Sequence, residues 1–138
     1  MQEQEVINIR TLHFGDLEIP QNNVLDFEFG ILGFEDLKRF VIISEEETEP
    51  FKWLLAIDEP NIGFPIVDPW LLDGNYNPGR GFKVEEEAIF TIITLGKADQ
   101  NMTANLKAPI VINIKENKGK QIILPNDKYS PTYVVSKK

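Results

Sequence analysis

Apolar and polar residues alternate along much of this chain, which predicts short β-strands. In the segments 12–14, 17–19, 51–57 and 110–114, every second residue is apolar, and Lys52 lies on the opposite face of the third segment. Successive side chains of a strand point to opposite faces, so this alternation gathers apolar side chains on one face. The chain is therefore expected to contain several strands that pack on a common core.

Turn-forming residues between these segments predict two β-hairpins. Gly15-Asp16 separates the first two segments, and Glu116–Gly119 separates 110–114 from a further strand at Gln121–Leu124. Glycine, asparagine and aspartate are common at such turns because they tolerate positive φ.

The remaining pattern fits a single all-β domain. Residues 89–95 are β-branched or apolar on both faces, which predicts a central strand covered on both sides. Helical periodicity is scarce, and only 34–39 fits one short helical turn. We therefore predict a compact single-domain β-barrel-like fold over residues 1–138, with short, mostly antiparallel strands and little helix. The polar tail from about residue 126 is expected to be loosely held.

The composition makes the chain acidic. It has 22 Asp and Glu against 14 Lys and Arg, a formal net charge of −8 at pH 7. Such a charge repels nucleic-acid backbones and anionic lipid surfaces, and it favours a basic protein partner. The alternative interpretation is that acidic segments such as the loop 45–50 only keep the protein in solution.

Residue types that the chain lacks narrow its chemistry. It has no cysteine and one histidine, His13, which excludes disulfides, thiolate metal sites and thiol nucleophiles. A Ser-His-Asp triad is disfavoured because Ser44, Ser130 and Ser136 lie outside any nucleophile-elbow pattern. The chain starts without a signal-peptide pattern and has no apolar run near the roughly 20 residues that span a bilayer, so we expect a cytoplasmic protein.

The strongest metal-like motif is Asp73-x-Asn75-x-Asn77, which matches the first three ligand positions of a calcium-binding loop. Such a loop needs Gly at its sixth position and Glu at its twelfth, where this chain has Pro78 and Val84. The motif is better explained as part of a surface loop of turn formers. A small metal-assisted hydrolase that uses this loop is kept as an alternative function, as is a structural subunit of a larger assembly.

Longer blocks of sequence resemble a known family. The block 102–113, MTANLKAPIVIN, followed by KGKQIIL at 118–124, closely resembles the flagellar assembly factor FliW family. Shorter blocks resemble it in the same order along the chain: FGDLEI at 14–19, GILGFE at 30–35, FKWL at 51–54 and VDP at 67–69. The resemblance covers nearly the whole chain and implies a single β-barrel-like domain.

The resemblance also implies a binding protein without catalytic residues, cofactor or metal. The resemblance implies a switchable adapter with two partners, flagellin and the RNA-binding translational repressor CsrA. Cytoplasmic flagellin occupies FliW, and after flagellin is exported, free FliW binds CsrA and relieves repression of flagellin translation. By this resemblance we expect a monomer that binds flagellin and CsrA and contacts neither nucleic acid nor membrane directly. An acidic surface suits the capture of a basic RNA-binding protein.

Six residues are candidates for contact with these partners. The acidic ones suit basic groups, the tryptophan suits an interface anchor, and the last two are the exposed members of the 102–113 block. For Asn105 a structural role in satisfying a turn is an equally good interpretation. The candidates are Asp58, Glu59, Asp68, Trp70, Asn105 and Lys107.

The chain departs from the family pattern in two places. FliW sequences often have proline after the residue that corresponds to Phe27, where this chain has Glu28. Between Trp70 and Ile89 the family usually has a longer acidic, partly helical stretch, whereas this chain has a loop of Gly, Pro and Asn followed by acidic residues. If 71–88 contacts a partner, we expect the affinity or the choice of partner to differ.

Overall fold

The computed structural model describes residues 5–79, 85–96, 101–125 and 127–135. They form strands joined by turns and short 3-10 helices, and none of their helices is long and apolar enough to cross a lipid bilayer. The strands are β1 (Val6–Thr11), β2 (Gly15–Pro20), β3 (Leu25–Phe27), β4 (Arg39–Ser44), β5 (Lys52–Ala56), β6 (Gly63–Val67), β7 (Glu87–Thr94), β8 (Thr103–Ala104), β9 (Ile110–Asn113), β10 (Lys118–Gln121) and β11 (Tyr133–Val134). The 3-10 helices are η1 (Gln21–Asn23), η2 (Glu46–Thr48) and η3 (Pro69–Leu71).

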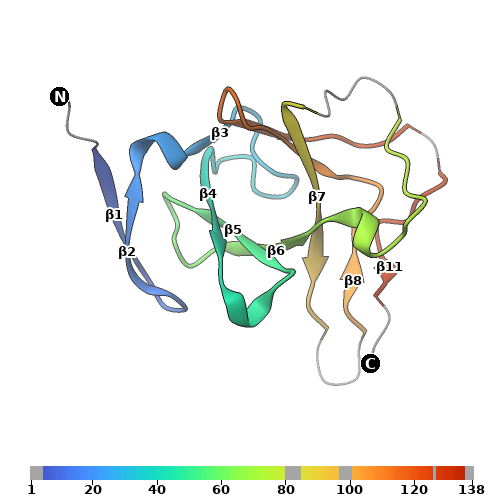
Figure 1. Cartoon of the computed structure of the whole chain (residues 1–138), viewed down its shortest axis with the longest axis horizontal. Helices are drawn as coiled ribbons and strands as arrows, with labels where there is room; N and C mark the ends of the chain where they lie inside the picture. The colour runs from blue at the N-terminus through green and yellow to red at the C-terminus, as the bar shows by residue number, and fades with distance from the viewer. Residues whose placement is uncertain (1–4, 80–84, 97–100, 126, 136–138) are drawn as a thin grey trace.

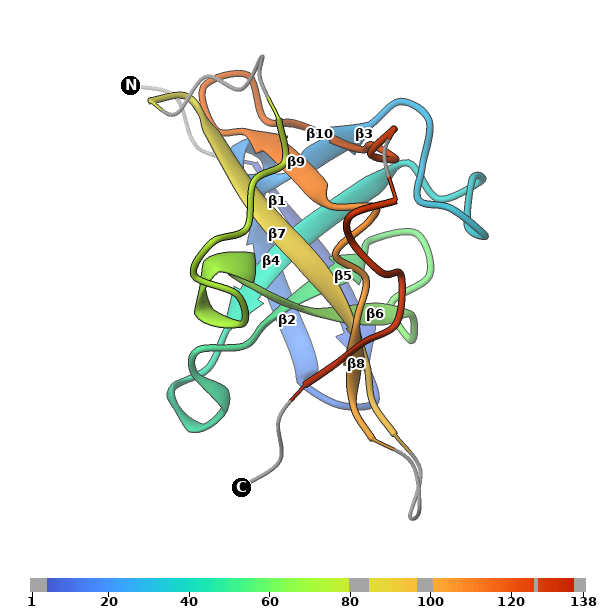
Figure 2. The same cartoon turned by 90° about the vertical axis from the view of Figure 1, so that its right-hand side faces the viewer.

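Most of these strands close into a barrel (Figures 1 and 2). The order around it is β7-β6-β5-β4-β3-β10-β9, and β9 pairs with β7 to complete the ring. Neighbours in the ring are antiparallel except β3 and β10, whose parallel pairing joins Asp26 to Lys118 and Phe27 to Gly119. Strands β8 and β11 extend the sheet beyond β7. The predicted barrel of short, mostly antiparallel strands is confirmed.

Large apolar side chains fill the barrel. Phe27, Phe40, Leu54, Ile66 and Ile110 are completely buried there. The rings of Phe27 and Phe40 meet edge-on, with centroids 5.0 Å apart. Removing such a side chain from water contributes about 1.5–3 kcal/mol, so these residues supply much of the driving force for closure.

Strands β4 and β5 bury both of their faces. Phe40 and Leu54 point into the barrel, whereas their sequence neighbours Val41 and Leu55 pack beneath the β1–β2 hairpin, against Ile9. The alternation predicted in 51–57 therefore identified one of two buried faces. The hairpin covers the outer face of these strands, which explains why their sequences are apolar nearly throughout.

The first predicted hairpin is present, but its turn lies earlier than expected. β1 and β2 pair from Val6 with Pro20 to Thr11 with Gly15, so the turn is 12–14 and not Gly15-Asp16. The Thr11 hydroxyl accepts a hydrogen bond from Phe14 N and donates to Gly15 O, and Gly15 has a φ of 74°. A three-residue turn followed by a glycine with positive φ is a common hairpin connection.

The second predicted hairpin shows a similar shift. β9 and β10 pair from Asn113 with Lys118 to Ile110 with Gln121, so the second strand precedes the predicted one at 121–124. Asn117 adopts a φ of 56° and completes the turn, which leaves Ile114 63% exposed. The central strand predicted at 89–95 is confirmed as β7, which pairs with β6, β8 and β9.

The helical turn predicted at 34–39 is wrong. The chain there forms consecutive turns, in which Phe34 N donates to Ile31 O at 2.6 Å and Leu37 N donates to Phe34 O at 3.1 Å. Arg39 then begins β4 and pairs with Asp26 of β3. The backbone of Phe34 bonds back to Ile31 in an isolated β-bridge, and this pairing takes the place of a helical bond.

Residues 127–135, which we expected to be loosely held, pack against the barrel. β11 pairs with β8, and Tyr129 is buried in a cluster with Tyr76, Leu106 and Leu124. Aromatic residues in the tail supply enough apolar surface to dock it, although its average composition is polar. Residues 126 and 136–138 lie outside the described part of the chain.

Replacing Gly119 with alanine is expected to lower the free energy of unfolding by about 1–3 kcal/mol through overpacking. The new Cβ would overlap ring carbons of Phe27, which the core holds completely buried. Gly74→Ala is the control, because nothing lies within 4 Å of its Cβ position. Urea unfolding monitored by tryptophan fluorescence measures both variants, and equal midpoints for the two would contradict the proposed contact.

Candidate partner-binding site

The six predicted contact residues lie in three stretches of the chain. Asp58 and Glu59 lie in the turn between β5 and β6, Asp68 and Trp70 lie at η3, and the remaining two precede β9. Figures 1 and 2 both place the β5–β6 turn and η3 on opposite sides of the molecule. The six residues therefore do not form a single site.

Asp58 is engaged within the chain. Its carboxylate accepts two hydrogen bonds from Arg39, from Nη2 at 2.6 Å and from Nε at 3.2 Å. These bonds hold the pKa of the Asp58 carboxyl below its usual value. Both side chains are partly exposed, so the pair contributes little to stability and mainly fixes the turn on β4. Glu59 is exposed beside it, and its carbonyl accepts a hydrogen bond from Ile62 N.

Asp68 and Trp70 form the start of η3. The Asp68 carboxylate caps the helix by accepting a hydrogen bond from Trp70 N at 2.8 Å. Trp70 is 40% exposed, and its ring meets the edge of Tyr76 with centroids 5.6 Å apart. Tyr76 is buried, and its hydroxyl donates to Leu106 O at 2.6 Å. Burial raises the pKa of that hydroxyl, so it stays protonated and remains a donor at neutral pH.

Asn105 and Lys107 also make contacts within the chain. Asn105 Oδ1 accepts a hydrogen bond from Ala108 N at 3.0 Å, which is the turn-satisfying role given above as the alternative. Lys107 Nζ lies 2.8 Å from Asp127 Oδ1, and this bond lowers the pKa of the Asp127 carboxyl. The Lys107–Asp127 pair ties the tail to the segment before β9.

The calcium-like motif is built as turns. Asp73 Oδ1 accepts a hydrogen bond from Asn75 N, and Asn77 Oδ1 accepts one from Gly79 N, each at 2.9 Å. Within the described ranges, no group of three or more His, Asp or Glu side chains is placed to hold a metal ion. The twelfth position of the motif, Val84, lies outside those ranges. Both side-chain oxygens therefore have the turn role that the sequence favours.

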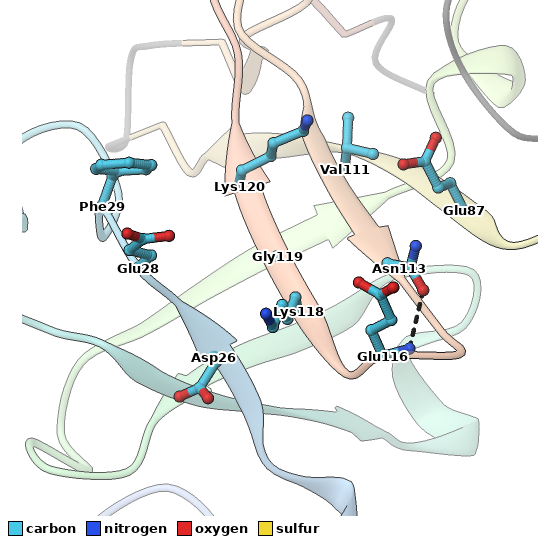
Figure 3. A pocket seen from close by; sticks show the side chains of 10 residues that line it. All are labelled: Asp26, Glu28, Phe29, Glu87, Val111, Asn113, Glu116, Lys118, Gly119 and Lys120. Atoms are coloured by element: carbon cyan, nitrogen blue, oxygen red, sulfur yellow. Dashed lines mark hydrogen bonds between the residues drawn. The ribbon is translucent and has the colours of Figure 1, made fainter.

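A groove that sequence analysis missed crosses the outside of the barrel over β3, β10 and β9 (Figure 3). Its volume is about 500 Å³. Figure 3 shows carboxylates on both sides of β10, with two lysines on that strand between them. The charged residues that line the groove are Asp26, Glu28, Glu87, Glu116, Lys118 and Lys120.

Strand register sets this order of charges. Asp26 pairs with Lys118, Lys118 with Asn113, and Asn113 with Glu87, so one row across four strands reads acid, base, amide, acid. Neighbouring strands lie about 4.8 Å apart, so the two acidic ends of the row are about 15 Å apart measured along the curved sheet. At the end of the groove, Asn113 Oδ1 accepts a hydrogen bond from Glu116 N at 2.9 Å.

Five of the six charged side chains of the groove are not neutralised by ion pairs between described residues. Among the described residues, the carboxylates of Asp26, Glu28 and Glu116 and the ammonium groups of Lys118 and Lys120 take part in none of the ion pairs within 4.0 Å. Their charges are therefore directed to solvent. The groove is accordingly the best candidate in the described structure for a partner-binding site.

Comparison with known proteins decides the family. The family model described as FliW protein matches residues 8–135. The chain belongs to the FliW family. The flagellar assembly factor FliW of Thermoanaerobacter pseudethanolicus is 44% identical over 137 residues, which cover 89% of each chain. That of Thermosipho africanus is 39% identical over 132 residues, which cover 88% of this chain and 91% of the relative.

A crystal structure of the flagellar assembly factor FliW has the same fold, with a TM-score of 0.86 and 31% sequence identity. The match covers 96% of this chain and 99% of that one. The predicted membership is thus confirmed by sequence and by structure, and this FliW-family protein is a flagellar assembly factor.

Glu28, where FliW sequences often have proline, lies in a β-turn of this FliW-family protein. Gly30 N donates to Phe27 O at 2.9 Å, so Glu28 and Phe29 are the central residues of a β-turn. Proline is favoured at the first central position of such turns because its φ is preset. Glutamate at this position instead places a carboxylate at the edge of the groove.

Replacing Tyr76 with phenylalanine is expected to lower the free energy of unfolding by about 1–2 kcal/mol, because the Leu106 carbonyl loses a buried donor. Tyr133→Phe is the matched control. Its hydroxyl donates to Leu72 O at 3.1 Å in a less buried position, so the expected loss is smaller. Chemical unfolding at pH 7 compares the variants, and a larger loss for Tyr133→Phe would show that the assigned order is wrong.

Proposed function

We propose that this FliW-family protein is a non-enzymatic cytoplasmic adapter that binds flagellin and antagonises the translational repressor CsrA. The observation that carries the proposal is the FliW family match over residues 8–135. In this scheme, flagellin that has not yet been exported occupies the protein. Export of flagellin frees the protein to bind CsrA, which relieves repression of flagellin synthesis.

The charge of the chain supports the CsrA part of the proposal. A net charge of −8 attracts a basic RNA-binding protein and repels the RNA that competes for it. Complementary charge raises the association rate, often well above that of neutral partners. A protein of this charge can therefore sample the repressor quickly after flagellin has left.

Two coupled binding equilibria are enough to make a switch. If bound flagellin lowers the affinity for CsrA by some factor, bound CsrA lowers the affinity for flagellin by the same factor. The free flagellin concentration then sets the fraction of adapter that is available to the repressor. Neither partner needs to be modified chemically.

The purified protein is expected to co-elute with CsrA and, in a separate experiment, with flagellin during size-exclusion chromatography. Raising the ionic strength should weaken the CsrA complex, because screening reduces the attraction between exposed opposite charges. Failure to co-elute with either partner at low salt would refute the proposed function.

Flagellin added to a preformed complex with labelled CsrA is expected to release the label in proportion to the flagellin added. The reverse titration should give the same coupling factor, because linkage is reciprocal. Fluorescence anisotropy measures both directions. A stable complex of all three proteins with unchanged affinities would contradict the switch while leaving both binding activities in place.

A further inference from the structure

Phe29 stands at one end of the groove with 74% of its surface exposed (Figure 3). The β-turn formed by Phe27 to Gly30 places it at a corner of the chain, as the second central residue of the turn. The backbone before it is also tied down, because Lys38 Nζ donates to Glu28 O at 3.0 Å. Large apolar side chains held in solvent beside a hollow are typical anchors of protein interfaces.

The loop behind this anchor is braced on both sides. Gly30 has a φ of 67°, and a Cβ there would lie 2.6 Å from Glu35 Cα, so only glycine allows the close approach. Leu32 N donates to Gln121 Oε1 at 2.8 Å, and Gln121 Nε2 donates to Ala108 O at 3.1 Å. The anchor is therefore largely preorganised, which lowers the entropy lost when a partner binds.

The charges of the groove select the chemistry of that partner. Its acidic residues outnumber its lysines, and the surface carries the acids on both edges of the lysine strand. Phosphate-rich ligands such as nucleic acid would meet carboxylates on either side. A basic polypeptide would instead place its side chains on the carboxylates and its carbonyl oxygens towards Lys118 and Lys120.

We propose that the groove binds an extended, basic segment of a partner protein and that an aliphatic side chain of this segment packs on Phe29. An extended chain sends successive side chains to opposite sides, so neighbouring basic residues reach the two acidic edges together. The acids of β3 and of the β9–β10 turn flank β10, whose two neighbouring strands lie about 10 Å apart, a span that two arginine side chains on either side of a strand cover. The inference deepens the proposed function, because a basic RNA-binding repressor supplies such a segment.

A short arginine-rich peptide that ends in leucine is the first probe. Titrated into the isotope-labelled protein, it is expected to shift the backbone NMR signals of residues 26–29 and 111–120. A peptide with glutamate in place of arginine is expected to shift none of them. If the basic peptide leaves these signals unchanged, or shifts mainly the acidic segment 45–49, the groove assignment is overturned.

Charge reversal tests the acidic edges. The double variant Glu28→Lys/Glu116→Lys is expected to bind the basic peptide at least about tenfold more weakly than the wild type. Glu46→Lys/Glu47→Lys changes the net charge equally on the exposed segment around η2 and is the matched control. Equal losses in the two double variants would mean that total charge, and not the groove, attracts the peptide, which would refute the proposal.

Phe29→Ala tests the anchor with a readout that folding alone would not change. The variant should bind the peptide ending in leucine about fivefold more weakly than the wild type does, and its affinity for a peptide ending in serine should stay nearly the same. Leu12→Ala is the control, because Leu12 is 90% exposed in the β1–β2 turn away from the groove. Equal effects on both peptides, or an equal effect of Leu12→Ala, would remove the assigned contact.

The same variants separate this inference from the proposed function. If the wild type binds CsrA and the groove double variant binds it equally well, the groove assignment fails and the adapter function stands. If the wild type binds neither CsrA nor flagellin, the adapter function fails, and the peptide titrations still decide the groove.

Discussion

The parallel contact between β3 and β10 is the constraint on which both the barrel and its groove depend. Only two residue pairs make it, Asp26 with Lys118 and Phe27 with Gly119. Antiparallel pairings connect the other neighbours in the ring, and this contact joins the first barrel strand to the C-terminal hairpin β9–β10. It is possible because Gly119 has no side chain where the buried ring of Phe27 lies. The glycine on β10 thus leaves room for the phenylalanine ring of β3, and this close packing lets the two strands pair and close the barrel.

The same contact decides what the surface presents. Alternation along each strand sends Phe27 inward, and its neighbours Asp26 and Glu28 line the groove outside. Because β10 runs alongside, its lysines stand between these acids and the acids near β9. Most of the residues predicted as contacts instead use their polar groups within the chain, with Asp58 holding Arg39 and Lys107 holding Asp127. Contact of these residues with a partner stays a prediction.

Local sequence patterns predicted which hairpins form better than they predicted the residues at which the turns lie. Alternating apolar residues and nearby turn formers predicted both hairpins, because these signals depend on neighbours in sequence. The turns were predicted at the wrong residues because strand register determines which residues stay unpaired between the strands. The last pairs before the two turns are Thr11 with Gly15 and Asn113 with Lys118. A helical turn was wrongly expected at 34–39, where the pairing of β3 with β4 determines the path of the chain.

The amino-acid sequence by itself determined the all-β class, the acidic charge, the absence of cysteine chemistry and the resemblance to the FliW family. These are properties of composition and of short-range order, which can be read without knowing how distant segments meet. Only the tertiary structure decided that Asp26 pairs with Lys118, that Glu28 lines the same groove, and that the β-turn at Phe27 to Gly30 holds Phe29 in solvent beside them. Such placements depend on pairings between segments far apart in the chain, and packing in three dimensions selects those pairings.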